Sequence, residues 1–236
     1  MKKKQKHRRL RTLTCIITLV LYVYNVSIWI PVLLLIIFEQ RDQIRQIVRK
    51  LTGKTLFDGQ DAMFKKNIID INVYGEYGVG TSTSWVFNNT KAKILSVDTS
   101  MEWINDVKSK INSSDRAEID WVDLGQLGDW GRPATYKKRK YFFNYIHSIW
   151  SKEDKPELVL IDGRFRVACF LFSLISASAG TKIIFDDYVN RKHYHVIEEF
   201  VQPIETYCRQ ALFIVPKELD IKNIKKTIEQ FTHVIN

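Results

Sequence analysis

The stretch Val73-Tyr74-Gly75-Glu76-Tyr77-Gly78-Val79-Gly80-Thr81-Ser82-Thr83 decides the fold of this 236-residue chain. The preceding run, residues 67–73, is rich in β-branched residues and predicts a strand, and the hydroxyl residues that close the stretch predict the start of a helix. A strand, a glycine turn and a helix N-terminus together place free backbone N–H groups against a bound ligand. A dinucleotide fingerprint needs Gly or Ala where Thr83 stands, which weakens an NAD interpretation.

Several residues of this stretch are candidates for ligand binding. Glu76, predicted at a strand end, can accept hydrogen bonds from an ammonium group. Gly78 and Gly80 shape the turn, and Ser82 and Thr83 offer hydroxyls and helix N-terminal amides. The alternative interpretation is a purely structural glycine turn, which occurs in many α/β proteins.

Further short apolar runs follow, separated by helical stretches. They cover residues 93–98, 117–124, 157–163, 181–187 and 211–216. This alternation predicts an α/β fold with a mostly parallel, doubly wound sheet. Four runs end in acids, namely Asp98, Asp123, Asp162 and the pair Asp186-Asp187.

We expect these acids to gather at one edge of the sheet, because ligands of open α/β sheets bind outside the carboxyl ends of the strands. Asp98 follows the glycines by about 20 residues, the position of a ribose-hydroxyl acceptor. For any single acid, a solvated loop residue or helix cap is the alternative.

Three segments carry a family resemblance. They are Glu-Tyr-Gly-Val-Gly-Thr-Ser-Thr at 76–83, Asp-Gly-Arg-Phe-Arg-Val-Ala-Cys at 162–169, and Asp186-Asp187-Tyr188 with Arg191 and Tyr194. The chain resembles class I S-adenosylmethionine-dependent methyltransferases, and within them the small methyltransferase-like proteins whose motifs read EYGxGxST and DGRFRVAC. The resemblance extends over roughly residues 55–217. One departure is Val79-Gly80-Thr81, where relatives more often have Ser-Gly-Gly.

The resemblance implies a Rossmann-like methyltransferase fold and S-adenosylmethionine as the cofactor. The implied cofactor-binding residues are Glu76, Gly78, Gly80, Ser82, Thr83 and Asp98. Asp123 either meets the adenine or is structural. Asp162 is expected beside the methyl group that is transferred. The residues predicted to take part in catalysis are Asp162, Asp187, Arg164 and Arg166, with the two arginines orienting an anionic acceptor.

The sequence allows two interpretations of a possible metal site. Some methyltransferases of this class hold a divalent metal with acids after the same two strands, and Asp162, Asp186 and Asp187 would suit Mg²⁺ or Mn²⁺. The alternative is that Asp162 pairs with Arg164 or Arg166 and binds no metal, and we favour this alternative.

Charge and apolar residues divide the chain into two parts. The net charge is +10, from 36 basic and 26 acidic residues. Residues 1–50 hold 11 of the basic residues and two of the acids, so the remainder carries 25 and 24 and is nearly neutral. A neutral remainder argues against a nucleic-acid partner. The three cysteines have no spacing typical of a disulfide framework or zinc site.

The basic N-terminus precedes an uncharged apolar segment. Residues 12–38 carry no charge, and their 27 positions exceed the ~20 that span a bilayer. We therefore predict a basic cytoplasmic tip (1–11), a transmembrane helix as membrane anchor (12–38), a juxtamembrane amphipathic helix and linker (39–54), and a methyltransferase-like domain (55–236). A buried helix without membrane contact is the alternative for 12–38.

The side of the membrane is a separate question. The flanking lysines and arginines put the N-terminus in the cytoplasm, and a single span would then place the domain in a lumen or outside. A re-entrant segment bent near Pro31 would keep both ends cytoplasmic. We favour the cytoplasmic face for the domain, because S-adenosylmethionine is made there.

These features predict a membrane-anchored S-adenosylmethionine-dependent methyltransferase. It would O-methylate a glycan or a membrane-associated anionic intermediate, with the lipid bilayer and a small-molecule or glycan acceptor as partners. The alternatives are an aminopropyl-type transferase on the same fold and a non-catalytic membrane-bound scaffold. Residues 136–145 are aromatic and basic, and predict a membrane-facing helix, a substrate-covering helix or a plain surface helix. The oligomeric state stays open.

Overall fold

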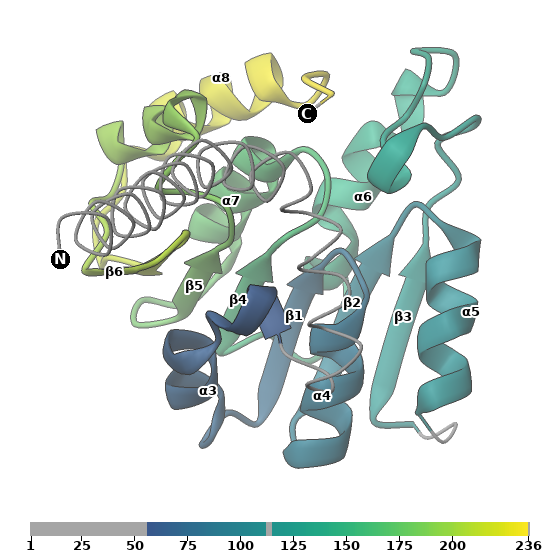
Figure 1. Ribbon diagram of the computed structural model, residues 1–236. Helices are drawn as coiled ribbons and strands as arrows, with labels where there is room; N and C mark the ends of the chain where they lie inside the picture. Colours follow the sequence, from purple (N-terminus) through teal and green to yellow (C-terminus); the bar gives the residue numbers. More distant parts are fainter. Residues whose placement is uncertain (1–55, 112–114, 236) are drawn as a thin grey trace, which may run out of the picture. The chain divides into compact units, whose positions relative to one another are not determined.

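The computed structural model describes residues 56–111 and 115–235 (Figure 1). The chain divides into two units, Met1–Asp58 and Gly59–Asn236, and the sheet described below belongs to the second. The predicted tip (1–11), anchor (12–38) and juxtamembrane segment (39–54) lie outside the described residues. Within the described ranges, none of the helices combines the length and the apolar character that crossing a bilayer requires.

One seven-stranded sheet organises the domain. Its strands are β1 (Val73–Tyr77), β2 (Lys93–Asp98), β3 (Ala117–Trp121), β4 (Leu158–Ile161), β5 (Lys182–Phe185), β6 (Glu205–Tyr207) and β7 (Gln210–Ile214). They lie in the order β3-β2-β1-β4-β5-β7-β6, and the first five are mutually parallel. The predicted Rossmann-like, mostly parallel fold is confirmed.

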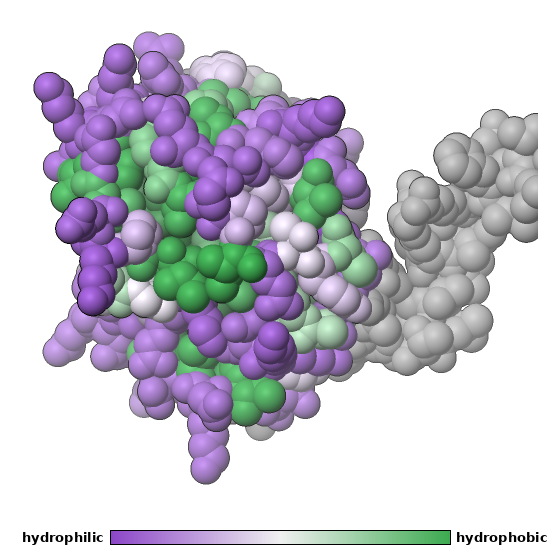
Figure 2. Space-filling view, turned by 90° about the vertical axis from the view of Figure 1, so that its left-hand side faces the viewer, coloured by the Kyte–Doolittle hydropathy of each residue, from purple (hydrophilic) through white to green (hydrophobic). Residues whose placement is uncertain are grey.

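The last two strands differ from the sequence prediction. β7 pairs antiparallel with β5, and β6, which was not predicted, pairs antiparallel with β7. The three residues of β6 are too few and too polar to produce an apolar run. Figure 2 views the molecule from the β6 side and shows patches of apolar surface among polar residues there; Ile204, next to β6, is one of the exposed apolar side chains.

Helices cover both faces of the sheet (Figure 1). The α-helices are α3 (Ala62–Ile68), α4 (Thr81–Asn89), α5 (Met101–Lys110), α6 (Phe142–His147), α7 (Arg166–Ser176) and α8 (Ile221–Phe231). The 3₁₀ segments are η1 (Leu56–Gly59), η2 (Asp129–Gly131), η3 (Arg139–Tyr141), η4 (Ser148–Trp150) and η5 (Lys192–Glu199). One face carries α3, α4 and α5, and the other carries α6, α7 and α8.

Alternation along the strands supplies both faces of the core. In β1, the Tyr77 side chain joins the large cluster beneath α6 and α7, whereas Tyr74 packs edge-on against Phe64 of α3, with ring centroids 5.8 Å apart. The side-chain period of two puts Glu76 on the same face as Tyr74. The whole strand is buried after its first residue.

The start of β1 lies later than the sequence predicts. Residues 67 and 68 belong to α3 and not to a strand, because Met63, Phe64, Asn67 and Ile68 are buried at the spacing of a helix face. β1 then begins at Val73, and Glu76 is its penultimate residue, close to the strand end where the sequence predicts it.

The carboxyl ends of the parallel strands meet at one edge of the sheet, as Figure 1 shows. β1 pairs with β2 on one side and with β4 on the other, so the connections diverge between β1 and β4. This is the switch point at which ligands of open α/β sheets bind.

Candidate active site

The first loop follows β1 directly and is held in a fixed shape. Gly78 has a φ of +91°, a left-handed conformation that favours glycine, and its N–H donates to the Val97 carbonyl at 2.9 Å. A Cβ on Gly80 would meet no atom within 4 Å. Open space above Gly80 and an ordered turn beneath it form a cradle that a ligand can approach closely.

Glu76 lies under this loop and is completely buried. Its carboxylate accepts hydrogen bonds from the hydroxyls of Ser82, Thr83 (2.5 Å) and Tyr74 (3.1 Å), and from Ser96 at 3.4 Å. Burial raises the pKa of Glu76 to about 7, against the opposing effect of these hydroxyl hydrogen bonds.

The hydroxyls predicted to bind the cofactor therefore meet Glu76 first. The Thr83 hydroxyl also accepts the N–H of Gly80 at 2.9 Å, and Ser82 and Thr83 are both buried. The structure brings Glu76, Ser82 and Thr83 together in one hydrogen-bonded group that fixes the turn at the start of α4. A direct contact of Glu76 with a cofactor ammonium stays a prediction.

Asp98 ends β2 and faces the same loop. One carboxylate oxygen accepts the N–H of Val79 at 2.9 Å, and the other accepts the N–H of Ser100 at 2.7 Å. The Thr99 N–H also interacts with this carboxylate, which has about four acceptor positions and so keeps capacity for a further donor. Burial raises the pKa of Asp98, while these backbone N–H groups and the nearby Arg164 oppose the rise.

Asp123 lies farther out than the other predicted acids. It pairs with Lys138 and accepts the Gly125 N–H at 2.9 Å. The Lys138 ammonium and this N–H lower the pKa of Asp123. Its carboxylate holds the chain after β3 to the segment that follows. These contacts agree with a structural role for Asp123, and a contact with adenine stays a prediction.

Arg166, at the start of α7, joins the ends of β4 and β5. Its side chain is buried, and its five N–H donors all have protein acceptors. They reach the carbonyls of Gly163 (3.1 Å), Asp186 (2.6 Å) and Asp162 (3.2 Å), and the carboxylates of Asp162 (3.0 Å) and Asp187 (3.5 Å). All the N–H groups of this guanidinium are therefore hydrogen-bonded within the protein, and none remains to bind the molecule that receives the methyl group.

The three predicted metal ligands do come together. One carboxylate oxygen from each of Asp162, Asp186 and Asp187 lies within 4.8 Å of the other two. Each carboxylate also faces a guanidinium: Arg166 contacts Asp162, Arg209 lies 2.7 Å from Asp186, and Arg191 lies 2.7 Å from Asp187.

Each carboxyl group of this cluster is thus paired with its own guanidinium. A divalent cation would have to displace a guanidinium or leave excess positive charge, so this set of side chains does not fit a metal. The pairing of Asp162 with Arg166, one of the two alternatives that the sequence left open, is present.

Asp162 differs from Asp186 in its exposure. The Asp186 side chain is fully buried, whereas about a third of the Asp162 side chain (32%) reaches the surface. Partial burial and the neighbouring carboxylates of Asp186 and Asp187 raise the pKa of Asp162, and Arg166 opposes the rise. A carboxylate with a raised pKa at an accessible position suits proton transfer near neutral pH.

Two elements of this edge were not found in the sequence. The Tyr145 hydroxyl on α6 accepts the N–H of Arg164 at 3.2 Å, and the Arg209 guanidinium reaches back from the turn before β7. Arg209 stands alone in sequence before an apolar run, without a motif to mark it. Its role depends on the antiparallel direction of β7, which the sequence did not predict.

Left-handed backbone conformations gather at this edge. Phe165, Trp130 and Asp187 have φ values of +53°, +59° and +58°, which are uncommon for residues with a side chain. Phe165 directly precedes α7, and Asp187 directly follows the buried Asp186. Such strain persists only where the surrounding structure holds it, and it concentrates at functional sites.

Comparison with known proteins places this geometry in a family. No family model and no curated protein matches the chain. Among solved structures, a methyltransferase-like protein from Silicibacter pomeroyi is 30% identical, with a TM-score of 0.63; the match covers 72% of this chain and 92% of that one.

Two further structures are more distant. An O-methyltransferase from Bacillus cereus in complex with SAH is 17% identical, with a TM-score of 0.49, and covers 75% of this chain and 89% of its own. The N-methyltransferase NodS from Bradyrhizobium japonicum, in complex with S-adenosyl-L-homocysteine, is 10% identical with a TM-score of 0.46, and covers 68% and 88%. On the first of the three matches, the chain belongs to the family of the methyltransferase-like protein from Silicibacter pomeroyi.

Proposed function

We propose that this protein is a membrane-anchored S-adenosylmethionine-dependent methyltransferase that O-methylates an anionic acceptor, either a glycan or a membrane-associated intermediate. The observation that carries the proposal is the meeting of the open glycine turn, Asp98 and Asp162 at the switch point of the sheet. Family membership supports the methyltransferase part.

The residues present fit the cofactor. The remaining acceptor capacity of the Asp98 carboxylate suits a ribose hydroxyl, and the open space above Gly80 suits close approach of the ligand to the backbone. When bound, S-adenosylmethionine supplies an electrophilic methyl group for in-line displacement. Glu76 acts beneath the turn, where its carboxyl group fixes the hydroxyls of Ser82 and Thr83.

Acceptor chemistry is assigned to residues after β4 and β5. In its ionised form, Asp162 accepts the proton of an acceptor hydroxyl, because its side chain is accessible and its raised pKa makes that carboxylate a stronger base. Arg164 is partly exposed and orients an anionic group on the acceptor. Arg166 holds Asp162 in place through its hydrogen bond, and Asp187 pairs with the same guanidinium.

The membrane part of the proposal comes from the sequence. The uncharged segment 12–38 is long enough to span a bilayer, and we place the domain on the cytoplasmic face, where the cofactor is made.

Calorimetric titration of the full-length protein in detergent tests the cofactor site. We expect S-adenosylmethionine to bind and NADH to give no signal. Asp98→Asn should weaken binding by roughly ten- to a hundred-fold, since it removes a charge-assisted hydrogen bond. The matched control is Asp106→Asn on α5, where the acid pairs with Lys110 on the surface; its affinity should equal that of the native chain.

The same titration separates the alternatives. An aminopropyl-type transferase would bind decarboxylated S-adenosylmethionine more tightly than the parent compound, and a scaffold would bind neither. Equal affinity of the native and Asp98→Asn proteins would show that the site assignment is wrong.

A further inference from the structure

A stretch without acids borders the site. From Trp130 to Lys152 the chain has six basic residues and no aspartate or glutamate. Lys138 pairs with Asp123, but Lys137, Arg139 and Lys140 on either side of it are exposed. The stretch is therefore a local concentration of positive charge on a domain whose total charge is nearly neutral.

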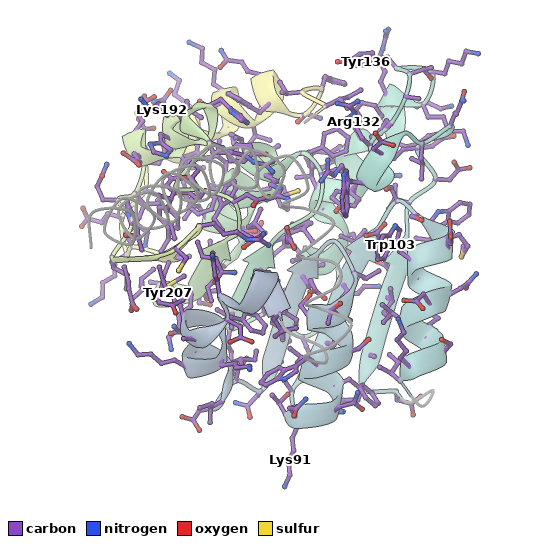
Figure 3. The ribbon with its side chains drawn as sticks, viewed as in Figure 1. Lys91, Trp103, Arg132, Tyr136, Lys192 and Tyr207 are labelled. Carbon is purple, nitrogen blue, oxygen red and sulfur yellow. The ribbon has the colours of Figure 1, made fainter. Side chains whose placement is uncertain are left out.

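Exposed aromatic side chains lie on the same stretch. Trp130 is 78% exposed, Tyr136 51% and Tyr141 38%. Figure 3 shows Tyr136 and Arg132 near one another above the carboxyl ends of the strands, at the outer limit of the domain. We name the following set the rim surface: Trp130, Tyr136, Lys137, Arg139, Lys140 and Tyr141.

The exposed Trp130 stands on a fixed support. Leu127 and Pro133 form an antiparallel bridge around it, and the Thr99 hydroxyl donates to the Gly131 carbonyl at 2.6 Å. The backbone of Trp130 is left-handed, with a φ of +59°. The turn thus holds a large aromatic ring in solvent, in an uncommon backbone conformation that the surrounding contacts maintain.

We infer that the rim surface docks on the surface of an anionic lipid bilayer. Tryptophan and tyrosine favour the headgroup level of a membrane, and exposed lysines and arginines are attracted to anionic lipids. Aromatic and basic residues also bind nucleic acid. However, the same chain carries the uncharged segment 12–38, and residues 51–236 hold 25 basic and 24 acidic residues, so the domain has no overall basic excess. Both facts favour lipid.

Docking would bring the site to the lipid headgroups. The rim surface continues into Gly131, which packs on Thr99 next to Asp98, and into Lys138, which holds Asp123. The acceptor would then be a molecule embedded in or linked to the bilayer. This consequence for the acceptor rests on the proposed methyltransferase function, whereas the lipid contact does not.

Hydrogen exchange on the full-length protein in nanodiscs tests the contact directly. Discs of phosphatidylcholine alone are compared with discs that also contain phosphatidylglycerol. We expect peptides that cover residues 129–147 to exchange several-fold more slowly in the anionic discs. Peptides from α8 should be unchanged, although α8 also exposes lysines.

A matched pair of variants controls for charge. Lys137→Glu/Arg139→Glu/Lys140→Glu should abolish the lipid-dependent protection, and Lys222→Glu/Lys225→Glu/Lys226→Glu on α8 should retain it. Trp130→Ser should reduce it without a change in charge. Both triple variants should bind S-adenosylmethionine as the native chain does, so a failed lipid contact is distinguished from a failed cofactor site.

Three results would overturn the inference. They are equal exchange of residues 129–147 in both kinds of disc, the same loss of protection in both triple variants, and protection by added RNA in the absence of any lipid effect.

Discussion

Gly78 and Gly163 lie so close together that neither position can accept a side chain. A Cβ on Gly163 would lie 2.8 Å from the backbone nitrogen of Gly78, and a Cβ on Gly78 would lie 2.9 Å from the Cα of Gly163. The Tyr145 hydroxyl lies on the other side of Gly163, 2.0 Å from the same Cβ position. The loops after β1 and β4 thus meet backbone to backbone at the switch point.

This contact predicts opposite effects for two glycine substitutions. Gly163→Ala should lower the free energy of unfolding by about 1–3 kcal/mol or more, because backbone atoms on one side and Tyr145 on the other must shift. Gly80→Ala should change it by less than about 1 kcal/mol, since its Cβ points into open space, yet weaken S-adenosylmethionine binding. Chemical denaturation and calorimetry measure the two effects. A stable Gly163→Ala protein would contradict the packing described here.

Arg166 and Arg191 form ion pairs with the same oxygen of Asp187 but should differ in their effect on stability. Arg166 is buried, and its loss leaves the half-buried carboxylate of Asp162 and the backbone carbonyls that it joins without their donor, so Arg166→Ala should cost roughly 3–5 kcal/mol. The Arg191 side chain is 43% exposed, so Arg191→Ala should cost less than about 1 kcal/mol. Urea unfolding of the two variants measures the difference. Equal losses in the free energy of unfolding would show that Arg166 does not join the ends of β4 and β5 as described.

Glu76 should make stability depend on pH between about 4.5 and 7. In that range the unfolded chain has released the proton, whereas the folded protein retains it, because burial raises the pKa of Glu76 to about 7. The folded state therefore loses stability as the pH rises, by on the order of 3 kcal/mol in total, and regains it on acidification. Glu76→Gln should remove this component.

The measurement is the denaturation midpoint of the native and Glu76→Gln proteins at intervals between pH 4.5 and pH 8. Glu229→Gln, an exposed acid on α8, is the control and should follow the native curve. An identical pH dependence of the native and Glu76→Gln proteins would mean that Glu76 is not protonated in the folded state.

Chelation should leave methyl transfer unchanged. The charges of Asp162, Asp186 and Asp187 are already balanced by arginines, so the cluster has no need of a cation. Transfer of a labelled methyl group to a membrane extract, measured with and without EDTA, tests this expectation. Loss of transfer in EDTA and its recovery with Mg²⁺ would show that a metal displaces one of the arginines.

The sequence by itself determined the class of fold and the edge of the sheet where the site lies. Apolar runs that alternate with helical stretches are local signals, and four of the five parallel strands follow them closely; β2 has the bounds that its pattern predicts. Strand-end acids such as Asp98 and Asp162 meet because parallel strands share one carboxyl edge. The apolar run 67–73 includes the end of α3 and the first residue of β1, so its pattern did not show where the helix ends. The predicted start of this strand was therefore wrong.

Only the tertiary structure decided which polar groups face each other. The motifs at 76–83 and 162–169 mark Glu76 and Arg166 as ligand-binding candidates. In the fold, Glu76 lies under the start of α4, and all five N–H donors of Arg166 bind acceptors within the protein. The charge balance of the acidic cluster depends on Arg209, which reaches Asp186 from the turn before an antiparallel strand, 23 residues away in sequence. Burial and pairing across such distances are properties of packing, and spacing along the chain does not encode them.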